Sequence, residues 1–256
     1  MVARVILCAM LAMSAPATVA AEPTAAPAVE PAPSPQSLLG SIRARFHARS
    51  LPPFESYTLT RSQNTATGVL DFPNSYSKRV WVRNSDRTAL TRTVLSNGTR
   101  GPLEFDRPAF NEERDPGPPT ADMFESPNGV SDYRLDSLET QGDLLHLRIS
   151  PVLNADRNRL REVFADKQTY ELRTLIAVDA LFIVRGPVYP VTFTITMGAV
   201  EGYPVVTAAH GVVGGDYNGD GKEVDYTFTA ISFPATLPDW YFDPRTYGQH
   251  GGDAPV

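Results

Sequence analysis

The residues best suited to chemistry lie in a short polar segment near the C-terminal end, residues 216–221. Asp216, Asn218 and Asp220 place oxygen atoms at alternate positions, and a glycine follows where a calcium loop turns sharply. The second half of the segment departs from a calcium loop, because Thr227 stands where a bidentate glutamate is expected. Two interpretations stay open: a Ca²⁺ site on these three residues, or a hairpin turn without metal.

Histidine is the other residue type that could act as a catalyst. The four histidines of the sequence stand at no metal-ligand spacing from one another. His210 is the candidate for a general base, since it ends a predicted strand beside glycine-rich turns, whereas His146 is expected to face solvent. Gly-x-Ser-x-Gly, His-Glu-x-x-His and phosphate-loop motifs are missing from the sequence. We therefore predict a protein that is not an enzyme, with a hydrolase using His210 as the alternative.

Strict alternation of apolar and polar residues marks the strands that would carry a binding surface. Residues 188–197 alternate most clearly, with threonines on the polar side, and residues 144–150 alternate in the same way. The apolar sides of these strands either line a cleft for an apolar ligand or simply pack beneath a helix. They comprise Leu145, Leu147, Ile149, Tyr189, Val191, Phe193, Ile195 and Met197.

Two predicted hairpins and one helix position these strands. Short polar turns at 141–143 and 166–169 separate β-rich runs, which indicates antiparallel hairpins. Leu38, Leu39, Ile42 and Phe46 recur at helical spacing after Ser34-Pro35, and this pattern predicts an amphipathic helix. Leu39, Ile42 and Phe46 would then face the sheet as a lid. The predicted fold class is α+β, a curved antiparallel sheet (half barrel) with one or two helices covering its concave face.

The remaining segments define the predicted domain organisation. Residues 1–21 have the charge, apolar core and small residues of a signal peptide, and residues 22–35 form an Ala/Pro-rich tether. The folded domain is expected over 36–245, followed by a flexible tail at 246–256. The proline-rich stretch 105–128 is either a mobile flap over the sheet or an ordinary solvated loop.

Composition narrows the classes of function. The 256-residue chain has a formal net charge of −6, which argues against a nucleic-acid partner, because such proteins carry a basic surface. Cys8, the single cysteine, lies inside the predicted signal peptide, so the exported chain would use neither disulfides nor cysteine catalysis. After residue 21 we predict no transmembrane segment.

The strand and turn pattern resembles the LolA/LolB superfamily of periplasmic lipoprotein carriers. The resemblance rests on the amphipathic helix before the first strand, on the hairpin around residues 143–149 followed by Pro151, and on the run 158–172. The closing segment 233–243 resembles the C-terminal stretch of uncharacterised relatives. The resemblance implies a half barrel, closed by helices, that holds acyl chains. No arginine cluster matching the one that holds the carriers' lid is evident in the sequence.

The sequence therefore predicts a periplasmic or secreted protein of the cell envelope that binds or carries a lipid or another apolar ligand. Its expected partners are lipid or lipoprotein acyl chains, together with an envelope component. The alternative is a structural module that uses its sheet for protein contacts.

Overall fold

The computed structural model describes residues 34–64, 75–96, 99–100, 107–109, 132–153, 155, 158–182, 188–214 and 223–250. These residues lie within one compact unit, Pro33–Val256. The predicted signal peptide and all of the predicted tether before Ser34 lie outside the described residues, as does most of the stretch 105–128.

Helix α1 spans Pro35–Phe46, as the apolar spacing predicted. The Ser34 hydroxyl accepts a hydrogen bond from the Ser37 amide (3.2 Å), which satisfies one of the free N–H groups at the start of the helix. Pro35 fits the first turn because that turn needs no amide donor from it. The helix therefore begins and ends where its local sequence directs it.

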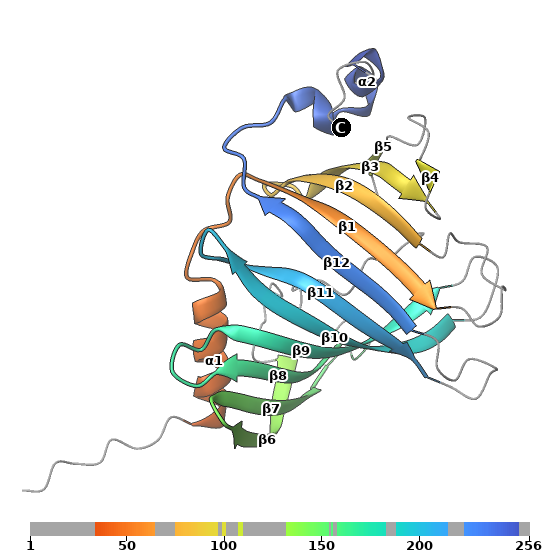
Figure 1. Ribbon diagram of the computed structural model, residues 1–256. Coiled ribbons are helices and arrows are strands. Elements are labelled where there is room, and N and C mark those ends of the chain that lie inside the picture. Colours follow the sequence, from red (N-terminus) through yellow and green to blue (C-terminus); the bar gives the residue numbers. More distant parts are fainter. Residues whose placement is uncertain are drawn as a thin grey trace, which may run out of the picture. The chain divides into compact units, whose positions relative to one another are not determined.

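Twelve antiparallel strands form a single sheet with the order β4-β3-β2-β1-β12-β11-β10-β9-β8-β7-β6, and β5 also pairs with β3. In the described part of the chain β4 and β6 end this order without pairing to each other, so the sheet is open, and Figure 1 shows its curvature. The fold is the curved α+β sheet that the sequence predicted. The strands are β1 (Phe54–Asn64), β2 (Ser75–Arg83), β3 (Thr88–Ser96), β4 (Thr99–Arg100), β5 (Arg107–Ala109), β6 (Tyr133–Gln141), β7 (Leu144–Pro151), β8 (Leu160–Asp166), β9 (Leu172–Phe182), β10 (Val188–Val200), β11 (Tyr203–Val213) and β12 (Glu223–Ser232).

Tight turns set the register of the hairpins. Gly142, between β6 and β7, has φ of 62°, a left-handed conformation that glycine adopts at little cost. The β10–β11 turn consists of Glu201 and Gly202, with φ of 52° and 78°. Positive φ at both central residues is typical of the two-residue turns that match strand twist. β10 continues through Gly198 to Val200, so the turn itself contains only these two residues.

Alternate residues of each strand face opposite sides of the sheet and build two separate apolar clusters. On β2, Val80 and Val82 join the large cluster that also contains Leu39 and Ile42 of α1. Trp81, between them, joins a smaller cluster with Leu90. We call the side covered by α1 the inner face and the side of Trp81 the outer face.

The C-terminal segment packs in the outer-face cluster. It consists of the 3-10 helix η4 (Asp239–Phe242), the short helix α2 (Pro244–Tyr247) and the 3-10 turn η5 (Gly248–His250). Tyr241, Phe242 and Tyr247 are buried there with Trp81. The predicted tail at 246–256 therefore begins too early, since Tyr247 is buried. Of the two α-helices in the described part of the chain, α1 is the one that packs in the cluster of the inner face.

Replacing Phe242 with alanine tests whether the C-terminal segment packs on the outer face, because Phe242 belongs to the outer-face cluster. The Phe242 ring stacks on Phe54 at 5.8 Å between centroids, and both tryptophans of the chain belong to or pack against this cluster. We expect Phe242→Ala to shift tryptophan emission to longer wavelength and to lower the free energy of unfolding by about 3 kcal/mol.

Phe228→Ala is the matched control, because Phe228 packs against the inner-face cluster. It should leave the emission maximum unchanged. An unshifted emission maximum in Phe242→Ala would contradict the assignment of the C-terminal segment to the outer face.

Candidate functional site

Most of the residues predicted to line a cleft for an apolar ligand lie on the inner face beneath α1. Val191, Phe193, Ile195 and Met197 of β10 are buried in the inner-face cluster, while the threonines between them are exposed. Tyr189 lies in β10, but its side chain is outside what the structure describes. Leu147 and Ile149 of β7 belong to the same cluster, and Leu145 packs against it.

Among the described residues, close packing leaves no open cleft at the centre of this face. Leu147, Val191 and Ile195 each have 0% of their surface exposed, so they border no space that a water molecule could enter. Ile42 of α1 is equally buried, and Phe46 packs against the same cluster. The predicted lid and the described part of the predicted lining thus belong to, or pack against, one apolar cluster.

Two exposed arginines fasten the C-terminal end of α1 to the sheet. Arg45 donates from Nη2 to Glu171 Oε1 at 2.6 Å, and both side chains are well exposed. Arg49 donates from Nη1 to the carbonyl oxygen of Glu201 in the β10–β11 turn at 2.7 Å. Gly202 makes room for this guanidinium, since a Cβ there would lie 2.6 Å from Arg49 Nη1. We call these two contacts the latch.

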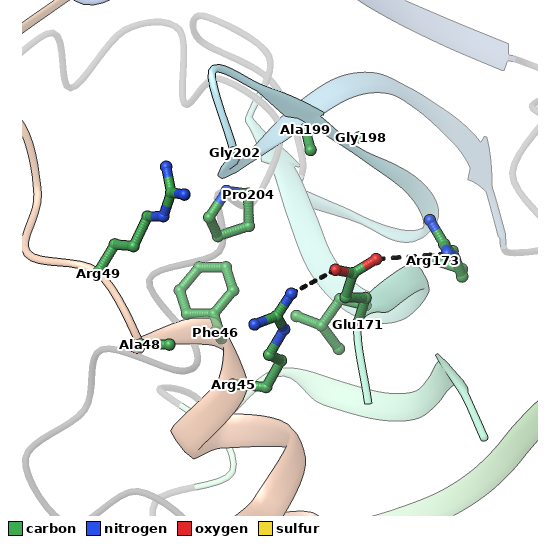
Figure 2. Close-up of a pocket in the computed structure, with 11 residues that line it drawn as sticks. Arg45, Phe46, Ala48, Arg49, Glu171, Arg173, Gly198, Ala199, Gly202 and Pro204 are labelled. Atoms are coloured by element: carbon green, nitrogen blue, oxygen red, sulfur yellow. Dashed lines mark hydrogen bonds and ion pairs between the residues drawn. The ribbon is translucent and has the colours of Figure 1, made fainter. Parts of the chain in front are cut away.

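A pocket of about 170 Å³ lies beside the latch. Arg45, Phe46 and Arg49 line one side of it, as Figure 2 shows. The opposite side comes from the segment Glu171–Arg173 at the start of β9 and from the β10–β11 hairpin. Among the predicted site residues, Phe46 is the one that lines this pocket. Local sequence gives no signal for the role of the arginines, because their partners are far away along the chain.

Asp166 fixes the turn that presents Glu171. Its Oδ1 accepts hydrogen bonds from the backbone amides of Thr169 and Gln168, each at 2.9 Å. These bonds, that of Thr169 first, lower the pKa of the Asp166 carboxyl below its ordinary value. The Asp166 carboxyl therefore stays ionised to a lower pH than an unpaired one, which preserves its two hydrogen bonds.

A buried cation interrupts the inner face. Arg61 of β1 is almost fully buried, donates from Nε to the Tyr226 hydroxyl at 3.2 Å, and lies over the rings of Tyr76 and Tyr226. Cation–π contacts of this kind offset the cost of burying a guanidinium. The inner face is therefore apolar with a buried cationic position, and Lys78, which lies between Tyr76 and Val80 on the same side of β2, adds a second cation over the Tyr76 ring.

The histidines show no catalytic arrangement in the described part of the chain. His146 lies on the opposite side of β7 from Leu147, as predicted, yet the expectation that it faces solvent is wrong. It is buried, with Nε2 2.5 Å from Glu162 Oε2 and its ring stacked on Phe164 at 4.2 Å. His210 is exposed, and its Nδ1 lies 2.8 Å from Asp225 Oδ1.

The residues that the sequence predicted to bind a metal ion lie elsewhere in the chain. Asp216, Asn218 and Asp220 fall outside the described residues, so the Ca²⁺ interpretation stays a prediction. Within the part of the chain that the structure describes, no group of three or more His, Cys, Asp or Glu residues could hold a metal ion.

Neither a family model nor a curated protein matches this chain. Among solved structures, the chain is similar to LolA superfamily proteins. A LolA superfamily protein from Nitrosomonas europaea has 12% identity and a TM-score of 0.46, over 81% of this chain and 96% of that one. A DUF1329 family protein from Desulfovibrio piger has 12% identity and a TM-score of 0.49, over 83% and 98% of the two chains. A domain from Vibrio parahaemolyticus, described as an outer membrane lipoprotein-sorting protein, has 12% identity and a TM-score of 0.47, over 82% and 97%.

Loss of the Arg45 contact of the latch should loosen the end of α1 without unfolding the domain. Exposed ion pairs contribute about 0–1 kcal/mol, so we expect Arg45→Gln to leave the melting temperature nearly unchanged. Hydrogen exchange of the amides at the C-terminal end of α1 should become faster, because local opening no longer breaks the bond to Glu171.

Arg245→Gln serves as the matched control, since it removes an exposed ion pair with Asp243 in the outer-face segment. Its α1 amides should exchange at the wild-type rate. Equal α1 exchange rates in Arg45→Gln and wild type would show that the Arg45–Glu171 contact does not hold the helix.

Proposed function

We propose that this protein binds an apolar ligand, such as a lipid or an acyl chain, between α1 and the inner face of the sheet. The observation that carries the proposal is the way this face is covered. In the described part of the chain, a single 12-residue helix, α1, packs in the inner-face cluster. The sheet that carries this face has twelve strands. The end of that helix is attached through exposed side chains, so it can leave as a unit.

The chemistry of the face suits such a ligand. Its side chains come from β7 and β10 at its centre and are almost all apolar. An acyl chain that replaced α1 would contribute about 0.8 kcal/mol for each methylene it buries, which offsets the contacts that the helix gives up. Affinity would then depend on the length of the chain more than on any polar group.

The proposed setting is the cell envelope. Residues 1–21 carry the sequence features of a signal peptide, and the compartment they imply is the periplasm or the exterior. The described residues contain no helix long and apolar enough to cross a membrane. In this proposal the protein holds lipid or lipoprotein acyl chains as a carrier or binding protein, and it catalyses no reaction.

A structural module that contacts another envelope protein is the second candidate. The observation in its favour is the exposure of two adjacent apolar side chains, Val152 and Leu153, just beyond β7. This candidate needs no movement of α1. It predicts that a partner protein is recovered together with the chain while bound lipid is missing.

Binding of a neutral apolar dye tests the proposal. Ile42 is fully buried, so Ile42→Ala weakens the closed state by about 2–4 kcal/mol and should let N-phenyl-1-naphthylamine bind at least about tenfold faster than to wild type. The measurement is the rise in dye fluorescence after rapid mixing.

Ala44→Ser provides the control, because Ala44 lies on the exposed side of the same helix. It should bind the dye at the wild-type rate. Mass spectrometry of extracts from the purified protein should also find lipid. The proposal fails if extracts contain no lipid and the dye binds to neither wild type nor Ile42→Ala.

A further inference from the structure

The pocket beside the latch has a charge opposite in sign to that of the whole protein. Arg45, Arg49 and Arg173 line it, and Glu171 is the carboxylate among its lining residues. The chain as a whole has a formal net charge of −6. Three arginines therefore meet at one place on an acidic protein, and Figure 2 shows them around the pocket with Glu171 between Arg45 and Arg173.

The arginines have donors to spare. A guanidinium carries five N–H donors in a planar fork, a geometry that matches phosphate oxygens. Arg45 directs one donor to Glu171 and Arg49 directs one to the Glu201 carbonyl. Arg173 lies 3.4 Å from Glu171 and 3.6 Å from Asp166, beyond good hydrogen-bond distance. Arg45 and Arg173 are each about half exposed, so an incoming anion can reach them.

The floor of the pocket is apolar and continuous with the inner face. Phe46 and Leu172 both line the pocket, and both belong to or pack against the inner-face cluster. Pro204 adds a third apolar wall. A ligand with an anionic end and an apolar chain could thus place the anion among the arginines and pass its chain under α1.

Three features of the site oppose anion binding. Glu171 repels a second anion, the Asp166 carboxylate lies 3.6 Å from Arg173, and the C-terminal end of α1 contributes a partial negative charge. The three guanidiniums outweigh the two carboxylates and this partial charge in formal charge. Glu171 is also displaceable, because its bond to Arg45 is exposed to water and an exposed pair of this kind is weak.

We propose that this pocket binds the phosphate group of an anionic lipid headgroup, and that the phosphate replaces Glu171 as the partner of Arg45 and Arg173. A phosphate offers more acceptor oxygens than a carboxylate and can therefore engage several guanidiniums together. Replacing Glu171 breaks the bond that fastens the end of α1, so headgroup binding and opening of the inner face are coupled. This inference rests on the proposed function, since it identifies the class of ligand that the inner face receives.

Isothermal titration of the full chain tests the inference with three probes: dihexanoyl phosphatidylglycerol, dihexanoyl phosphatidylcholine and inorganic phosphate. Wild type should bind phosphatidylglycerol more tightly than phosphatidylcholine, whose headgroup is neutral overall. Arg173→Gln should weaken phosphatidylglycerol binding about tenfold, the loss expected for one charge-assisted hydrogen bond. Glu171→Gln should strengthen it, because the competing carboxylate is gone.

Arg245→Gln is the matched control and should bind phosphatidylglycerol as wild type does, since its ion pair lies on the outer-face segment. Equal phosphatidylglycerol affinities in wild type, Arg173→Gln and Glu171→Gln would overturn the inference. If inorganic phosphate binds but phosphatidylglycerol does not, the pocket is a site for a free anion, and the proposal of a lipid headgroup is wrong.

The dye experiment keeps this inference separate from the proposed function. Suppose that N-phenyl-1-naphthylamine binds, but that wild type, Arg173→Gln and Glu171→Gln have equal phosphatidylglycerol affinities. The apolar site is then supported and the headgroup site is wrong. If neither dye nor lipid binds to any variant, the proposed function falls as well.

Discussion

The whole structure depends on burial of the inner face of an open sheet. A sheet that does not close on itself cannot cover both of its faces, and this one carries apolar side chains from almost every strand on one side. Water must be excluded from Leu147, Val191 and Ile195, and α1 contributes Leu39 and Ile42 to that task. Most of the free energy that keeps α1 in place therefore comes from the same apolar contacts that an apolar ligand would make.

This arrangement separates the attachment of α1 into two parts. The apolar part, around Ile42, is strong and does not discriminate between a helix and an acyl chain. The polar part, at Arg45 and Arg49, is weak, exposed and specific in geometry. A ligand that meets the polar part first can loosen the end of the helix before it competes for the apolar face. The position of the pocket beside the latch places these two steps next to each other.

Local pattern was sufficient to predict the sheet and the helix, since their residues repeat at periods of two and 3.6. The alternation of Val191, Phe193, Ile195 and Met197 fixed which side of β10 is buried before any neighbour was known. What covers each face depends on residues far away in the sequence. Arg45 and Glu171 are 126 positions apart, and His146 is buried by Phe164 and Glu162 from the neighbouring strand. Tyr247 is likewise buried in the same cluster as Trp81, which no local signal near the C-terminus indicated.

The most direct test of whether α1 moves when a ligand binds is a distance between α1 and the sheet. In a chain with Cys8→Ser, spin labels at Ala44→Cys on α1 and Thr194→Cys on β10 occupy exposed positions on a helix and on the sheet beneath it. Pulsed electron paramagnetic resonance should give one short distance without ligand, and a second, longer distance when N-phenyl-1-naphthylamine saturates the protein. An unchanged distance distribution at full occupancy would show that the ligand binds without displacing α1, and it would contradict this account.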